Sequence, residues 1–222
     1  MVKTLVKTSA APAVQHDRHT EQRILDAAHT IFVRRGTAGA RMQEIAEEAG
    51  VNKALVHYYF RNKSRLAEAV FRRVASGLFA SAGAILGSDD DLETKVRRIV
   101  GLYLDQLSRT PYAPGYVISE LNQHPERAKQ LLDAVRQLRD DAMAPDFIET
   151  LARQLRAEAR KHSIRAIAPE QFIVNLVSLC IFPFAARPLL CTVLQLDDAG
   201  FARFVDDRKR TLPAFFLNAL RP

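Results

Sequence analysis

The sequence predicts an all-α fold of about nine helices, with a small N-terminal domain followed by a larger helical domain. Apolar residues recur at intervals of three and four along most of the chain, which is the spacing of one helix face. No stretch shows the sustained apolar and polar alternation of a strand. Cap and turn residues divide the pattern into short segments near the N-terminus and longer ones behind them.

The first predicted helix follows residues 1–18, which are small, polar and interrupted by Pro12, and which we expect to form a flexible arm. Thr20 has the features of a helix N-cap, because a hydroxyl oxygen can accept a bond from a free N–H of the first turn. Gly36 can take the left-handed conformation that ends a helix. The apolar positions with helical spacing between them are Ile24, Ala27, Ala28 and Ile31.

Two short helices are predicted next, Met42–Ala49 and Lys53–Phe60. Only Gly50, Val51 and Asn52 separate them, and Asn52 is the expected cap of the second. So short a connection makes the two helices cross at a large angle, which is the arrangement of a helix-turn-helix.

Helical patterns continue to the C-terminus. Asn62 or Ser64 caps a long fourth helix that reaches a break at Gly87–Asp91. The other predicted helices are Leu92–Leu107, Tyr116–Asn122, one from Pro125 to about Lys161 with a break near Pro145, Pro169–Leu190, and Asp198–Leu220. We therefore expect a flexible arm at 1–18, a helix-turn-helix domain at 19–66 and a second domain at 67–222.

The positive charge is concentrated in the first third of the chain. Residues 1–73 hold 13 Lys and Arg against 7 Asp and Glu, whereas residues 74–222 hold 19 against 18. This asymmetry is typical of a nucleic-acid-binding module joined to a neutral domain. A basic surface without a polyanionic partner is the alternative that charge alone leaves open.

Several classes of protein are not supported by the sequence. Cys180 and Cys191 have no CxxC spacing and no nearby His cluster, so we expect buried reduced thiols and no metal or cofactor site. Ser81, Ser178 and Cys180 lack the turn of a catalytic nucleophile, so we expect no enzyme. The start of the chain lacks the core of a signal peptide, and the apolar run Phe172–Ala186 is too short to span a bilayer. We therefore expect a cytoplasmic protein without membrane contact.

The most informative segment is Ala40–Lys63, because it divides into two faces. Its inward positions supply a hydrophobic face that can hold two helices at a fixed angle; they are Ile45, Ala46, Ala49, Val51, Val56 and Phe60. Its outward positions on the second helix are a cation, a small residue, an imidazole and a phenol, namely Lys53, Ala54, His57 and Tyr58. Such groups can reach base edges and phosphates in a major groove.

These residues resemble the TetR family of bacterial regulators. The resemblance covers residues 20–70 and rests on a set of positions: Gly36, Ile45-Ala46, Ala49-Gly50-Val51, Tyr59-Phe60, Lys63 and Leu66. It implies that Gln43, Lys53, Ala54, Leu55 and His57 face base edges, and that Arg41, Met42, Tyr58, Tyr59 and Lys63 lie against phosphates. Arg41, Leu55 and His57 depart from the residues usual in the family, so they bear on which operator is recognised.

Tyr58-Tyr59-Phe60 and the pair Arg34-Arg35 have a second interpretation each. The aromatic run could belong to the core, although two adjacent tyrosines on a helix cannot both point inward. Arg34 and Arg35 could contact phosphates, or could complement the negative end of the first helix.

The second domain offers weaker candidates for a ligand site, and each of them could equally belong to core or surface. They are Tyr103, Leu107, Tyr116, Glu120, Asn122, His124, Phe147, Leu151, Asn175 and Ser178. Glu120 and His124 lie four apart on one helical face and could form an exposed pair or a polar anchor for a mainly apolar ligand.

The last two predicted helices, Pro169–Leu190 and Asp198–Leu220, carry more apolar surface than a monomer of this size can bury. The resemblance implies that they form a homodimer interface. It also implies a repressor that leaves double-stranded operator DNA when a small hydrophobic or amphipathic ligand binds. A DNA-bound dimer whose second domain binds a protein partner, or no ligand, is the alternative.

Overall fold

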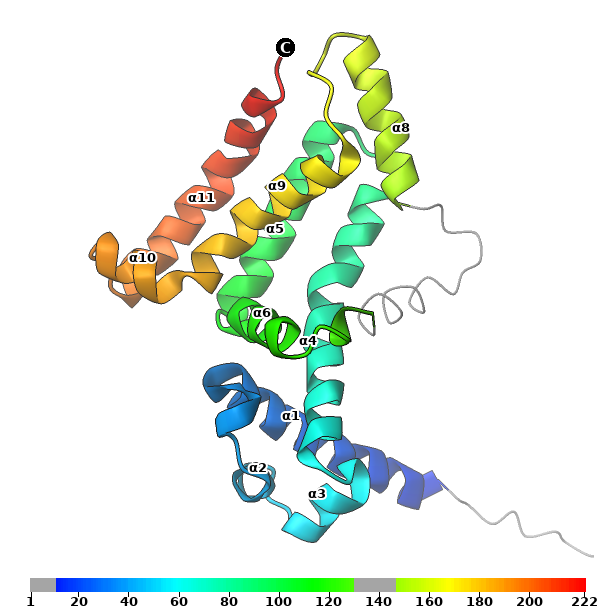
Figure 1. The fold of residues 1–222 in the computed structure, drawn as a ribbon, viewed down its shortest axis with the longest axis vertical. Coiled ribbons are helices and arrows are strands. Elements are labelled where there is room, and N and C mark those ends of the chain that lie inside the picture. Colours follow the sequence, from blue (N-terminus) through cyan, green and yellow to red (C-terminus); the bar gives the residue numbers. More distant parts are fainter. Residues whose placement is uncertain (1–10, 130–146) are drawn as a thin grey trace, which may run out of the picture. The chain divides into compact units, whose positions relative to one another are not determined.

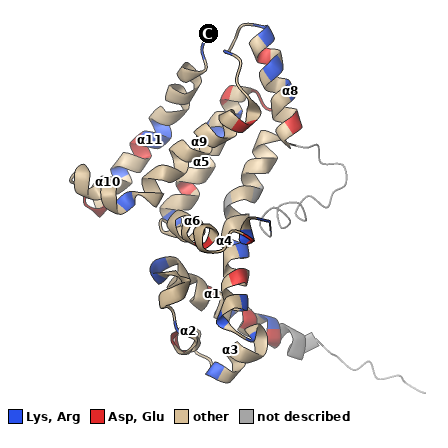
Figure 2. Cartoon of the chain, viewed as in Figure 1, with Lys and Arg blue, Asp and Glu red and all other residues tan. Residues whose placement is uncertain are grey.

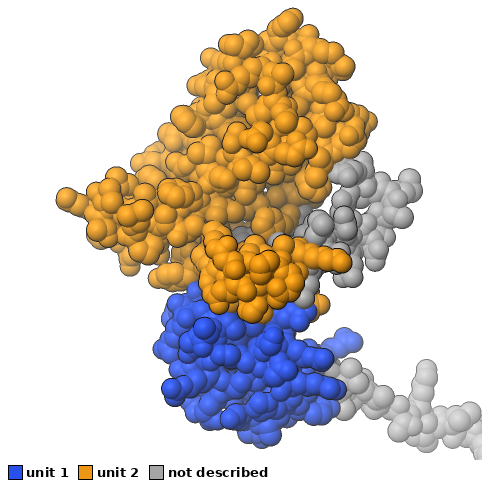
Figure 3. All heavy atoms as spheres, viewed as in Figure 1, with its two compact units in different colours: residues 1–71 blue, residues 72–222 orange. Residues whose placement is uncertain are grey.

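The computed structural model describes residues 11–129 and 147–222, which fold as two compact units, residues 1–71 and 72–222 (Figure 3). Within the described residues there are ten helices and no strand (Figure 1), which confirms the all-α prediction. The predicted boundary between residues 66 and 67 stays a prediction, and it lies within one continuous helix.

Unit 1 contains α1 (Ala11–Gly39), α2 (Met42–Glu48), α3 (Lys53–Phe60) and the first turns of α4 (Lys63–Leu86). The helices pack around one apolar core in which α2 contacts both α1 and α3. Each helix presents small or branched side chains on the inward face, which lets short helices approach closely. The core residues are Ile24, Ala28, Phe32, Ile45, Ala46, Val56, Phe60, Leu66 and Val70.

The start of α1 differs from the prediction. Residues 11–18 are helical and do not form the expected flexible arm, while residues 1–10 lie outside the described residues. Thr20 is buried inside the helix, so its prediction as an N-cap is wrong. Pro12 does not prevent this longer helix, because proline is tolerated in a first helical turn, where its missing N–H has no partner to lose. At the other end, Gly36 interrupts α1 as expected, but with a φ of +75° and a ψ of 160° it is extended and not in the expected left-handed helical conformation.

Cap residues determine where two of the other helices of unit 1 begin. The Asn52 side chain accepts a bond of 2.9 Å from Leu55 N–H and begins α3, and Asn62 does the same for Arg65 N–H at 2.9 Å. The predicted bounds of α3 are therefore confirmed, and Asn62 is the cap of α4 rather than Ser64.

Unit 2 holds the rest of α4 and six further helices: α5 (Leu92–Arg109), α6 (Ala113–Gln123), α8 (Phe147–Arg160), α9 (Pro169–Ala185), α10 (Arg187–Val193) and α11 (Asp198–Ala219). Helix α5 is central and packs against both α9 and α11 (Figure 1). Its buried stripe recurs at helical spacing, as predicted: Val96, Ile99, Val100, Tyr103, Leu104 and Leu107.

The single helix predicted at Pro169–Leu190 is wrong. The chain bends by 71° at Ala186, which separates α9 from α10. Pro188, in the first turn of α10, is the physical reason, because it cannot donate to the carbonyl four residues earlier and its ring clashes there. Pro183 is accommodated inside α9. The carbonyl of Leu179, which lacks its usual donor, accepts two bonds from the Arg208 guanidinium, at 3.0 and 2.8 Å.

The helix predicted from Pro125 starts later, since residues 125–126 form a turn and residues 127–129 are helical. The break expected near Pro145 lies outside the described residues. The short helix predicted at Tyr116–Asn122 is present and begins three residues earlier, at Ala113.

Two parts of the described chain are long and apolar enough to cross a membrane by length and composition, α4 and the bent pair α9 and α10. Helix α4 also supplies buried side chains to the cores of both units, among them Leu66, Phe71 and Leu86. Core helices commonly pass such a test, so composition alone does not make α4 a membrane span.

Candidate nucleic-acid interface

Helix α3 has one buried and one exposed face. Val56 is fully buried and Phe60 is buried beside it, which fixes the orientation of the helix in unit 1. The opposite face carries Lys53, Ala54 and His57, all exposed. Tyr58 is 73% exposed and Tyr59 is half-buried, so one tyrosine of the pair points outward, as predicted. An exposed cation, imidazole and phenol therefore stand on a helix whose other side is anchored.

None of the ten residues predicted to contact DNA is buried. Arg41 and Gln43 are exposed on α2 and its cap, whereas Met42, Leu55 and Lys63 are half-buried. The Gln43 amide donates to the Glu47 carboxylate at 2.8 Å. The structure thus brings the whole predicted set onto α2, α3 and the start of α4, and whether each contacts DNA stays a prediction.

Two arginines of α1 hold α2 at both of its ends. At the C-terminal end, Arg23 Nη2 donates to the carbonyl oxygens of Ala49 and Gly50, at 2.5 and 3.1 Å. At the N-terminal end, Arg35 Nη1 lies 2.9 Å from the Glu44 carboxylate. The cation at the C-terminal end also favours the negative pole of the helix dipole. Sequence analysis missed Arg23, because its partners are backbone atoms 26 and 27 residues away.

Glu44 has a second role, which offsets the missing side-chain cap of α2. Arg41 occupies the cap position and makes no side-chain cap bond. The Glu44 carboxylate instead accepts the Arg41 N–H at 3.1 Å, which is one half of a capping box. Arg35 therefore binds Glu44, which was neither of the two roles considered for the Arg34-Arg35 pair.

Two of the predicted phosphate ligands already have partners within unit 1. The Tyr59 hydroxyl donates to the Asp17 carboxylate, and this bond raises the pKa of the phenol. Lys63 Nζ donates to the carbonyl oxygens of Ala38 and Ala40, both at 3.1 Å. An ammonium group has three donors, so one N–H of Lys63 is left over for a phosphate oxygen.

The predicted ligand residues of unit 2 do not form one cluster. Tyr103, Leu107, Tyr116, Glu120 and Leu151 are buried, and Phe147 is half-buried with its side chain against Gly83 and Gly87. The remaining members lie toward the surface: His124 is half-buried, and Asn122, Asn175 and Ser178 are exposed. Asn175 and Ser178 therefore lie on the surface of unit 2, apart from the buried members of the set.

Glu120 has a different partner from the one expected. It forms a buried ion pair with Arg127, and both side chains are almost completely shielded from solvent. His124 Nδ1 instead lies 3.4 Å from the Glu126 carboxylate. Arg127 was missed, because the intervening turn that brings it back over α6 is not evident from helical spacing.

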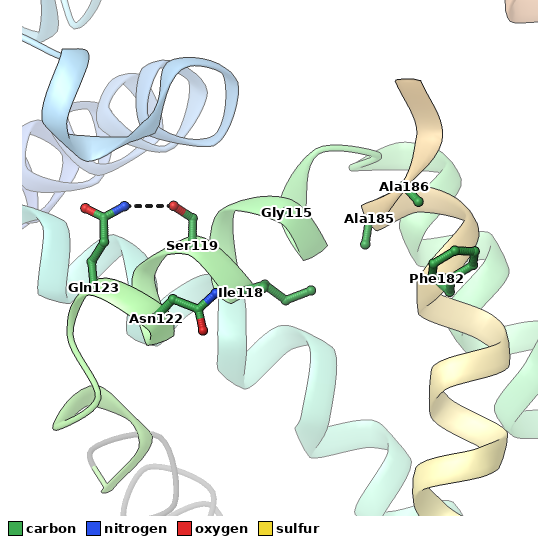
Figure 4. A pocket seen from close by; sticks show the side chains of 8 residues that line it. All are labelled: Gly115, Ile118, Ser119, Asn122, Gln123, Phe182, Ala185 and Ala186. Atoms are coloured by element: carbon green, nitrogen blue, oxygen red, sulfur yellow. Dashed lines mark hydrogen bonds between the residues drawn. The ribbon is translucent and has the colours of Figure 1, made fainter. Parts of the chain in front are cut away.

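An open groove of about 530 Å³ lies between α6 and the C-terminal end of α9 (Figure 4). Of the predicted ligand residues it includes only Asn122. Its lining is mostly apolar or small, with a polar edge: Gly115, Ile118, Ser119, Asn122, Gln123, Phe182, Ala185 and Ala186.

Two further observations concern the Cys180 thiol and the residue types that bind metals. Burial raises the pKa of the Cys180 thiol to about 12, so it stays protonated and is a poor nucleophile near neutral pH. In the parts of the chain that the structure describes, no three His, Cys, Asp or Glu side chains gather as metal ligands.

A family model described as bacterial regulatory proteins of the tetR family matches residues 24–70. The repressor SCO4008 of Streptomyces coelicolor is 32% identical over 58% of this chain and 67% of its own length. The uncharacterised regulator YvkB of Bacillus subtilis is also 32% identical, over 52% of this chain and 65% of its own length. The chain thus spans about two thirds of the length of these relatives.

The fold extends beyond these alignments. The crystal structure of a TetR family transcription regulator from Marinobacter aquaeolei VT8 superposes with a TM-score of 0.64. It covers 93% of this chain and 98% of that chain at 15% identity. At this identity the similarity concerns the fold alone.

Proposed function

The chain belongs to the TetR family of bacterial transcriptional regulators, and from this premise we propose that it is a cytoplasmic repressor that binds operator DNA as a homodimer and is released by a small molecule. The observation that carries the proposal is the exposed face of α3, with Lys53, His57 and Tyr58, on a helix anchored by Val56 and Phe60.

The chemistry of that face fits a major groove, which is about 12 Å wide and admits one helix. Lysine and histidine can donate to guanine acceptors or to phosphates, and the Tyr58 hydroxyl can donate to a phosphate. The excess of Lys and Arg over Asp and Glu in the first third of the chain supports this assignment (Figure 2). One short helix reads few base pairs, so specificity calls for two, about 34–36 Å apart.

Regulators of this family act as dimers, and we propose that α9 and α11 supply the interface. Supporting this are large apolar side chains that the monomer leaves exposed on these helices, Val174, Phe182 and Phe215. Exposed apolar patches of this kind are typical of association surfaces.

The effector is proposed to be hydrophobic or amphipathic and to bind in unit 2. The buried side chains of α5, α6 and α8 surround a small number of polar groups, chiefly Tyr103, Tyr116, the Glu120–Arg127 pair, and Lys95, which donates to Gln154 of α8 at 2.6 Å. A mainly apolar interior with a small number of polar groups is the usual composition of a ligand site. The ligand would stabilise a conformation in which the two α3 helices no longer match successive major grooves.

The direct test is fluorescence anisotropy with duplexes taken from the promoter region of the protein's own gene. We expect binding by a dimer with at least about a thousandfold preference over random DNA, within the range of specific binders. A stable monomer that ignores all such duplexes at low salt would refute the proposal.

Replacing a base-reading residue should relax sequence preference. Lys53→Ala or His57→Ala is expected to lose about 1–3 kcal/mol on operator DNA for each true base contact, with a smaller loss on random duplexes. Anisotropy on both duplexes measures the difference. Lys161→Ala, which removes an exposed cation from unit 2, is the matched control and should change neither affinity. Equal losses on operator and random DNA would show that the residue does not read bases.

Lys63→Ala should weaken binding to every duplex by a similar factor, since a phosphate contact carries no sequence information. The slope of log affinity against log salt should flatten by about 0.9, the contribution of one neutralised phosphate. The variant also loses the bonds to Ala38 and Ala40, so its thermal unfolding must be compared with wild type. An unchanged salt slope in a variant that remains folded would exclude the phosphate contact.

A further inference from the structure

Helix α10 carries apolar side chains that the described part of the chain leaves exposed. None of its residues is buried. Leu189, Val193 and the following Leu194 are 59%, 65% and 49% exposed. Residues 188–196 contain no charged side chain. An exposed apolar surface of this kind is typical of an association site.

The base of α10 also contacts α11. Arg187 Nη2 lies 2.8 Å from the Asp198 carboxylate, and its guanidinium stands 4.8 Å from the centre of the Phe201 ring. The Thr192 hydroxyl donates to the Pro188 carbonyl at 2.9 Å. The helix is therefore a preformed projection, directed away from the axis of α9 by the 71° bend at Ala186.

On the other side of the same bend lies the groove between α6 and α9 (Figure 4). Its apolar lining includes Ile118 from α6 and Phe182 from α9, while Ala185 and Ala186 leave space beside them. The Ser119 hydroxyl and the Gln123 amide bond each other at 2.9 Å along its edge, so these two polar groups do not need a ligand.

In the proposed homodimer, a two-fold axis close to Ala186, which lines the groove and precedes α10, would place the α10 of each subunit opposite the groove of the other. An isologous interface requires that a surface and its complement occur on the same chain, and here they adjoin. Phe182 belongs both to the groove and to the exposed apolar face of α9, so this contact continues the α9 and α11 interface. A small molecule in the groove would leave α10 uncovered, whereas a second copy covers both surfaces in both subunits.

We propose that α10 of each subunit docks into the α6–α9 groove of the partner subunit, an inference that rests on the proposed homodimer. The uncharged side chains Leu189 and Val193 enter the groove beside Ile118 and Phe182. Besides burying apolar surface, this arrangement connects the dimer contact directly to α6.

Inter-subunit disulfide formation tests the contact in the full chain. In a Cys191→Ser background, Leu189→Cys and Ile118→Cys are made as separate variants that carry tags of different mass. Co-expression and mild oxidation should give a covalent heterodimer in higher yield than either variant gives alone. Replacing Ile118→Cys by Ile148→Cys, on the exposed side of α8, is the control and should give none.

Sedimentation equilibrium supplies a second measurement. Val193→Asp and Ile118→Asp should each weaken self-association by at least about tenfold, whereas Ile148→Asp should leave it unchanged. Circular dichroism confirms that each variant is folded, and the disulfide experiment decides the question should one of them not be. A wild-type dimer that gives no Leu189–Ile118 disulfide, or that tolerates both aspartates, overturns the inference and leaves the proposed function intact. A wild-type monomer overturns both.

Discussion

A Gly50→Ala variant should lose about 2–4 kcal/mol of stability in unit 1 and most of its affinity for operator DNA. Gly50 has a φ of +62°, where an L-residue costs roughly 1–2 kcal/mol. A Cβ at this position would also lie 2.8 Å from Arg23 Nη2. The guanidinium can move aside only by giving up its bonds to Ala49 and Gly50, which are partly exposed to solvent and together contribute about 1–2 kcal/mol. The turn between α2 and α3 would then be displaced, and the orientation of α3 with it.

Variants of two other glycines distinguish the cost of backbone strain from the cost of losing the Arg23 bonds. Gly36 also has a positive φ, at +75°, with a ψ of 160° that essentially only glycine adopts, and a Cβ there meets nothing within 4 Å, so Gly36→Ala should show backbone strain without the loss of a bond. Gly39 has neither feature, and Gly39→Ala should be close to neutral. Urea unfolding followed by circular dichroism, with anisotropy on operator DNA, measures both effects. Gly50→Ala behaving like Gly39→Ala would mean that Arg23 does not hold the turn.

Arg127→Met should destabilise unit 2 by about 3–5 kcal/mol, because it leaves the Glu120 carboxylate buried without its counterion. The free energy cost of burying an isolated charge is far larger than that of burying a complete ion pair, and burial of apolar groups is favourable. Thermal and urea unfolding of the full chain measure the loss.

The double variant Glu120→Met with Arg127→Met distinguishes charge from packing. Removing both charges while keeping similar volume should recover most of the stability, as is common for buried ion pairs replaced by apolar side chains. Arg97→Met is the exposed control. It breaks a surface pair with Glu93, both side chains being more than half exposed, and should cost at most about 1 kcal/mol. An Arg127→Met variant no less stable than Arg97→Met would show that the buried pair is unimportant.

The exposed face of α3 could be predicted because its signals are local. Asn52 caps α3 through an atom three residues away, and the alternation of Val56 and Phe60 with Lys53 and His57 follows from helix geometry. The hydrogen bonds that Lys63 and Tyr59 make within unit 1 could not be predicted in this way. Their partners, Ala40 and Asp17, lie 23 and 42 residues away.

The extent of helices was harder to predict than their existence. Thr20 is a residue type that often caps helices, and yet it lies buried within α1. Packing of α1 inside unit 1 stabilises the longer helix more than a cap bond at Thr20 would. At Pro183 and Pro188 two prolines have opposite outcomes. Pro183 stays inside α9, where the orphaned Leu179 carbonyl finds Arg208 from α11, and Pro188 coincides with the bend.

The sequence by itself determined the all-α class, the bounds of α3 and the side of that helix that stays exposed, because these depend on residues within a few positions of one another. Only the tertiary structure decided that Arg23 holds the turn, that Glu120 pairs with Arg127 instead of His124, and that α10 stands apart from α9. Each of these features depends on the angle at which helices pack and on which long side chain then contacts a free carbonyl or carboxylate. Such contacts cannot be derived from a local sequence pattern.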